Sequence, residues 1–140
     1  MTLADDAYIL DEQVGFVLRL VNQRHIGIFG VEIPNLTPTQ FAVLAKLNEL
    51  GAMSQNELGR ATAMDAATIK GVVDRLAKRD VVFTIASTKD KRRLLVDLTP
   101  AGHEIYQRSV RKAHEVTRKT LAPLSAAEQR RLMELLTKLI

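Results

Sequence analysis

The chain has 140 residues, of which 46% are hydrophobic and 26% charged, and its formal net charge is +4. This composition is typical of a globular domain, and the 4% aromatic content without Trp argues against an RNA-stacking surface. The absence of Cys excludes disulfides, thiol chemistry and Cys-based zinc sites, and the absence of a long apolar run or a basic-then-apolar leader leads us to expect a cytoplasmic protein without a membrane partner.

The N-terminal segment predicts a long amphipathic helix from about residue 6 to residue 29. Its apolar positions recur at helical spacing, and they are Leu10, Val14, Val17, Leu18, Val21, Ile28 and Phe29. His25 falls on the same stripe, four residues after Val21.

A second helix is predicted to begin at Thr37-Pro38, an N-cap followed by proline in the first helical position. Its expected buried face consists of Phe41, Leu44, Leu47 and Leu50. Gly51 is expected to end it.

Two short helices follow. Ser54 and Glu57 have the spacing of a capping box and predict a helix to about Ala61. Asp65 is expected to cap the next helix, whose apolar positions point one way and are Ile69, Val72, Val73 and Leu76. Two helices joined by so short a turn have the helix-turn-helix layout, in which the second helix enters the major groove of DNA.

A β-hairpin with a cationic tip is predicted next. The β-rich runs 81–85 and 94–98 flank a polar loop, residues 87–93. The segment from Ser54 to Arg93 contains nine Lys or Arg and five acidic residues, which makes it +4. Such a charge suits a polyanionic partner, although ordinary solvated faces are the alternative that charge alone leaves open.

The C-terminal part predicts two helices. Thr99-Pro100 begins a long helix to about Leu121, Pro123 interrupts it, and a capping box at Ser125 and Glu128 opens a last helix with an apolar stripe. The first and last helices extend beyond what one small winged domain needs, so we expect a second copy of the chain to cover their stripes. A monomeric bundle is the alternative.

The chain resembles the MarR-type winged helix-turn-helix regulators over nearly its whole length. The resemblance rests on segment 36–44, which precedes the helix-turn-helix, on Ser54-Gln55 with Leu58, and on the recognition helix 65–76. The wing pattern Asp90-x-Arg92 followed by Leu98-Thr99-x-x-Gly102 completes it. It implies a single domain over 1–140, mainly α with a small β-hairpin. In it a winged helix-turn-helix over 36–99 hangs below dimerisation helices in 1–35 and 100–140. It further implies a homodimeric regulator, expected to be a repressor, that binds pseudo-palindromic double-stranded DNA and responds to a small ligand.

The resemblance also assigns DNA contacts. Those expected at the start of the recognition helix are Ala66, Ala67, Thr68 and Lys70, where short side chains permit close approach to bases. Arg92 is expected to enter the minor groove, with Asp90 orienting it or fixing the turn. Expected phosphate contacts are Lys89, Lys91 and Arg93 in the wing, Ser54 and Gln55 in the supporting helix, and Arg75, which with Asp74 is alternatively a structural ion-pair residue.

The chain departs from the family pattern in two places. Asp80 stands where a helix-ending Gly is frequent, and Thr84-Ile85-Ala86 replaces a strand that often carries Arg. We therefore expect fewer phosphate contacts from that strand and a larger contribution from the wing and Lys70.

A ligand pocket is expected around the stripe of the first helix, with Arg19, Asn22, Arg24 and His25 as its polar residues. Arg and His can pair with a carboxylate in a partly dry cleft, which favours an anionic guest. The run from Arg19 to Phe29 resembles that of family members responding to aromatic acids or their thioesters. His25 as an ordinary interface histidine is the competing interpretation.

An enzyme and a protein-interaction module are the two alternative classes of function. The three His lack the spacing of a zinc helix, and the chain has no nucleophile elbow and no Gly-rich phosphate loop, so we expect no enzyme activity, metal or cofactor. A winged-helix protein-interaction module is the second alternative, and the basic wing argues against it.

Overall fold

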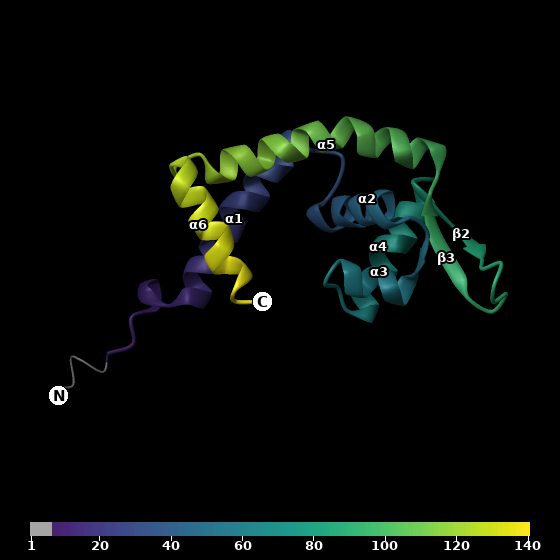
Figure 1. Cartoon of the computed structure of the whole chain (residues 1–140), viewed down its shortest axis with the longest axis horizontal. Helices are drawn as coiled ribbons and strands as arrows, with labels where there is room; N and C mark the ends of the chain where they lie inside the picture. The colour runs from purple at the N-terminus through teal and green to yellow at the C-terminus, as the bar shows by residue number, and fades with distance from the viewer. Residues whose placement is uncertain (1–6) are drawn as a thin grey trace.

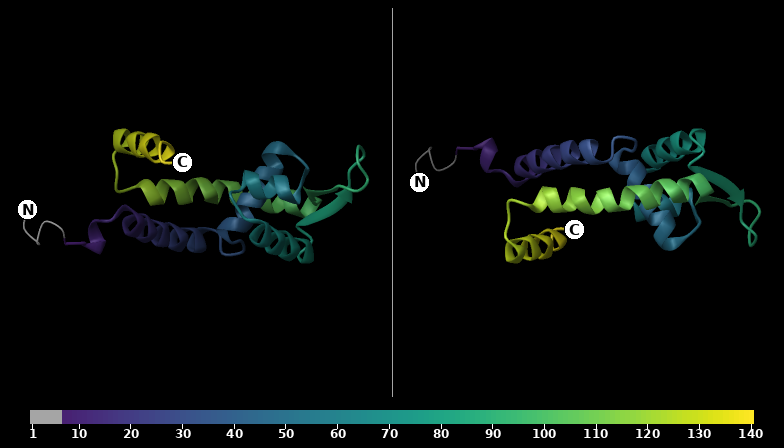
Figure 2. Two further views of the ribbon diagram at one scale, coloured as in Figure 1. Left: turned by 90° about the horizontal axis from the view of Figure 1, so that it is seen from below. Right: turned by 90° about the horizontal axis from the view of Figure 1, so that it is seen from above.

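Figure 1 shows the computed structural model, which describes residues 7–140. The longest helix, α5 (Pro100–Leu121), runs along one side of the molecule. Beneath its C-terminal half lie α1 (Val14–Glu32) and α6 (Ala126–Thr137), which flank α5 on opposite sides in Figure 2. The remaining helices and the sheet lie beneath its N-terminal half. The predicted fold class, mainly α with a winged helix-turn-helix, is confirmed.

The first helix begins later than predicted. A short 3-10 helix, η2 (Leu10–Glu12), is followed by Gln13 in an extended conformation, and α1 starts only at Val14. No side chain caps α1. The side-chain nitrogen of Gln13, Nε2, donates to the Ile9 carbonyl at 2.9 Å. The prediction that residues 10–13 continue the helix is therefore wrong, and Asp6 lies outside the described residues.

The apolar stripe of α1 is largely uncovered in the single chain. Val14 is 67% exposed and Val21 51%, whereas Phe29 at the other end is 6% exposed. No helix in the described part of the chain is long and apolar enough to cross a membrane.

Helix α2 (Pro38–Leu50) begins as predicted. Thr37 accepts from the Gln40 amide nitrogen at 3.1 Å, and the Gln40 side chain accepts from the Thr37 nitrogen at 3.1 Å, which forms a capping box. Leu44 and Leu47 are buried, but Leu50 is 57% exposed, contrary to the prediction. It lies one turn beyond the last buried position, where Gly51 at φ 80° turns the chain away.

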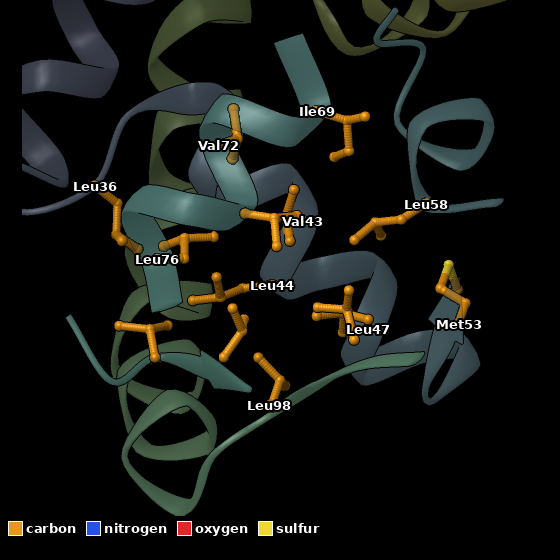
Figure 3. Close-up of a cluster of buried hydrophobic side chains, with 14 of the residues drawn as sticks. Leu36, Val43, Leu44, Leu47, Met53, Leu58, Ile69, Val72, Leu76 and Leu98 are labelled. Atoms are coloured by element: carbon orange, nitrogen blue, oxygen red, sulfur yellow. The ribbon is translucent and has the colours of Figure 1, made fainter. Parts of the chain in front are cut away.

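The helix-turn-helix consists of α3 (Gln55–Ala61) and α4 (Ala66–Lys78). In Figure 3 the side chains of these helices point toward those of α2 in one core, with Leu58 and Leu76 fully buried. The apolar face predicted for α4 is confirmed, because Ile69, Val72 and Val73 are also 1–3% exposed.

The sheet has one strand more than predicted. The hairpin strands β2 (Val82–Ala86) and β3 (Leu94–Leu98) pair antiparallel, with Val82 opposite Leu98. A two-residue strand, β1 (Met53–Ser54), pairs with the other edge of β3, so the order is β1-β3-β2. This pairing joins the start of α3 to the wing.

Candidate functional site

The exposed surface of α4 begins at its capped N-terminus. The Asp65 carboxylate accepts from the Thr68 amide at 2.7 Å, and this backbone hydrogen bond holds the pKa of Asp65 below its usual range. The four residues predicted to read DNA here are all exposed, namely Ala66, Ala67, Thr68 and Lys70. The cap thus fixes the start of the helix without covering its outer face.

Further along α4, two predicted contacts are arranged along the helix surface. Lys70 Nζ lies 2.9 Å from Asp74 Oδ2, an exposed ion pair one turn apart. The Arg75 guanidinium folds back over Gly71. Exposed pairs of this kind contribute little to stability, so Lys70 can exchange Asp74 for a phosphate at low cost.

The supporting helix α3 is joined to the wing by an ion pair that was not predicted. Ser54 Oγ accepts from the Glu57 amide at 3.2 Å, which confirms Ser54 as the N-cap. The Glu57 carboxylate does not complete the predicted capping box, because it pairs with the Arg93 guanidinium. Arg93 therefore ties the end of the tip loop, where it joins β3, to α3, and its role as a phosphate contact would require it to leave Glu57.

The tip of the wing is shaped by two side chains. Ser87, itself buried, accepts from the backbone nitrogens of Lys89 and Asp90 at 3.2 and 3.4 Å. Asp90 Oδ1 accepts from the Arg92 nitrogen at 3.0 Å and lies 3.8 Å from Arg92 Nε. The Arg92 side chain is nevertheless 96% exposed, so the turn presents it outward.

The polar residues of α1 lie where that helix meets α5. Arg24 donates to the carbonyl oxygens of Lys119 and Thr120, at 2.9 and 2.7 Å, and so satisfies the last turn of α5. His25 Nδ1 lies 2.8 Å from Thr120 Oγ1. Arg19 packs over the Phe16 ring, with 5.4 Å between Cζ and the ring centroid, and Asn22 is exposed. Of these four residues, His25 lines a cavity between α1 and α5.

That cavity, the α1–α5 cavity, has a volume of about 220 Å³ and is lined by His25, Phe29, Pro38, Phe41, Ala113, Val116 and Thr117. Its aromatic wall is rigid, because Phe41 packs edge-on against Phe29 and stacks on Tyr106, with centroids 6.2 and 5.9 Å apart. Two polar side chains, His25 and Thr117, in an otherwise apolar and partly aromatic lining suit a small planar guest.

Comparison with known proteins decides the family. A model of the MarR family matches residues 36–94. The transcriptional repressor NicR of Pseudomonas putida is 37% identical over 140 residues, which cover 99% of this chain and 89% of NicR.

The chain belongs to the MarR family.

It is accordingly a DNA-binding transcriptional regulator, as the sequence predicted. Among solved structures, a probable transcriptional regulator from Pseudomonas aeruginosa is 53% identical, with a TM-score of 0.92 over 94% of this chain and 100% of that one. BpsR of Bordetella bronchiseptica, whose DNA binding is regulated by 6-hydroxynicotinic acid, is 39% identical, with a TM-score of 0.91 over 95% and 96% of the two chains.

Several contacts between distant residues of this MarR-family regulator were not predicted from its sequence. Thr120 is 95 residues from His25, and Arg93 is far from Glu57, so neither pair leaves a local pattern. A signal existed only for Gln40, which stands three residues after Thr37 as a capping box requires.

Proposed function

We propose that this MarR-family regulator is a homodimeric repressor of the cytoplasm that binds a pseudo-palindromic operator and releases it when a small aromatic carboxylate or its thioester binds. The observation that carries the proposal is the pairing of an outward, capped α4 surface with a basic wing tip. Thr68 and Lys70 would contact base edges or phosphates in the major groove, and Arg92 would enter the minor groove. Ser54, Gln55, Arg75, Lys89 and Lys91 would contact phosphates.

The exposed apolar faces of the terminal helices support a homodimer. On α1 Val17 and Leu18 are each 43% exposed, and near the C-terminus Leu135 is 43% and Leu139 68% exposed. Exposed apolar stripes of this kind mark an interface, and a second copy presents the same stripes. Two reading helices related by a twofold axis would then match two half-sites about one DNA turn apart.

The α1–α5 cavity supports an aromatic carboxylate as effector. The cavity volume of about 220 Å³ lies below the usual range for drug-sized ligands, which favours a single-ring acid. His25 would pair with the carboxylate and the ring would lie against Phe29 and Phe41. The Arg24 guanidinium is hydrogen-bonded to α5, and Arg19 lies over Phe16 and does not line the cavity, so a contribution from Arg19 or Asn22 would have to come across the dimer.

A calorimetric titration tests the effector. We expect 6-hydroxynicotinic acid or another single-ring aromatic acid to bind the wild type saturably and to bind His25→Ala at least tenfold more weakly. His103→Ala, an exposed histidine on α5, is the matched control and is expected to bind like the wild type. Equal affinities for all three proteins would contradict the assignment of His25.

A further inference from the structure

A second and larger cavity, the cationic cavity, lies where three segments of the chain meet. Its volume is about 350 Å³, and its walls come from the α1–α2 connection, the C-terminal end of α4 and the N-terminal half of α5. No residue lines both this cavity and the α1–α5 cavity. The two are therefore separate sites.

Three cations face the cationic cavity, and these are Arg79, Arg108 and Lys112. None of them forms an ion pair within residues 7–140. Arg79 Nη1 makes a long contact of 3.4 Å with the neutral Gln40 Oε1. All three are exposed, no carboxylate lines the cavity, and their combined positive charge would attract an anion into it.

The floor of the cationic cavity adds a polar group and an apolar surface. Ser109 is only 9% exposed, and its hydroxyl makes no hydrogen bond to any residue of the described chain. Ile33 and Leu36, which are 3% and 5% exposed, form the apolar part of the lining. The lining thus combines a hydroxyl, three cations and apolar side chains.

We infer that the cationic cavity binds a small organic phosphate. A single carboxylate would neutralise one of the three cations, whereas a phosphate monoester carries close to two negative charges and three acceptor oxygens at neutral pH. Its organic part would lie against Ile33 and Leu36. Because Arg79 is the C-cap of the recognition helix α4, an occupant would join the end of that helix to α5 and to the α1–α2 connection.

The test is a calorimetric titration of butyl phosphate, which has no aromatic ring for the α1–α5 cavity, onto the full-length protein, without DNA, at pH 7.5 and moderate salt so that non-specific attraction is screened. We expect saturable binding with one phosphate per chain, and at least tenfold weaker binding of butanoate. Arg108→Ala and Arg79→Gln are each expected to weaken butyl phosphate binding at least tenfold.

Two matched variants make the result specific. Arg111→Ala removes a neighbouring exposed cation of α5 that does not line the cavity, and His25→Ala alters the other cavity, so both are expected to bind butyl phosphate like the wild type. The inference is overturned if binding is not saturable, if Arg111→Ala weakens it as much as Arg108→Ala does, or if only His25→Ala abolishes it. Each of these outcomes leaves the proposed operator binding and aromatic effector untouched.

Discussion

Gly102, in the first turn of α5, lies directly against the carbonyl group of Val81, so that a side-chain Cβ at this position would overlap the carbonyl oxygen. The contact joins the start of the longest helix to the residue just before the wing strand β2. The Thr99 hydroxyl strengthens the same junction by donating to the Asp80 carbonyl at 2.6 Å, while it caps α5 through the Gly102 amide at 2.9 Å. The Leu98-Thr99-x-x-Gly102 pattern therefore has a packing cause.

Replacing this glycine is expected to be costly. Gly102→Ala forces a side-chain methyl group against the Val81 carbonyl, and we expect it to lower the free energy of unfolding by at least about 2 kcal/mol in chemical denaturation. Gly15→Ala is the control, since a Cβ there meets nothing within 4 Å. A Gly102→Ala protein as stable as Gly15→Ala would contradict the close approach.

Asp80 supplies a second backbone test. It follows the C-cap of α4 and has φ 58°, the left-handed conformation in which glycine has no steric penalty. We expect Asp80→Gly to be more stable than Asp80→Ala by about 1 kcal/mol, measured by chemical denaturation. Equal stabilities of the two variants would show that residue 80 does not keep this conformation in solution.

The sequence predicted the local chemistry of this fold well. Thr37, Ser54, Asp65, Thr99 and Ser125 are all N-caps, because a cap is decided within four residues. Contacts between distant segments were not predictable in the same way. The strand β1 is two residues long, too short to show alternation, and the Glu57–Arg93 pair depends on the register that this strand sets.

The candidate sites differ in the same way in how far the sequence predicts them. The reading helix and the wing tip are continuous in sequence, so the residues assigned to them could be named in advance. The two cavities are built from segments up to about 90 residues apart, and their composition depends on how α1 and α2 pack on α5. For this reason the sequence did not indicate that Arg79 and Arg108 line the same cavity. It indicated Arg24 as a polar residue of the first helix but not its hydrogen bonds to α5.

The cap of α4 gives a pH dependence. The hydrogen bond from the Thr68 amide lowers the pKa of Asp65 from its ordinary 3.8, so this carboxylate stabilises the folded state above that pH and loses its contribution as the pH falls through the lowered value. We expect the wild type to exceed Asp65→Asn in unfolding free energy at pH 7 and the difference to shrink toward pH 3. A difference that is constant with pH in denaturation experiments would contradict the charged cap.

The wing tip gives a prediction for DNA binding. Arg92→Ala is expected to weaken operator binding by about 1–3 kcal/mol, because the fully presented guanidinium would leave the minor groove. Arg130→Ala, on α6, is the matched control. An unchanged dissociation constant for Arg92→Ala in fluorescence anisotropy at moderate salt would remove Arg92 from the interface.

This regulator is expected to couple operator binding to the binding of an aromatic acid. The most direct test of that coupling is fluorescence anisotropy of the wild type titrated onto a labelled duplex from upstream of its own gene, across a salt series, with and without a panel of aromatic acids. We expect tight, salt-dependent binding of a dimer, preferred over a random duplex and released by one acid. Binding no tighter than to the random duplex would contradict operator recognition and favour a protein-interaction module, and specific binding that no acid releases would contradict the effector.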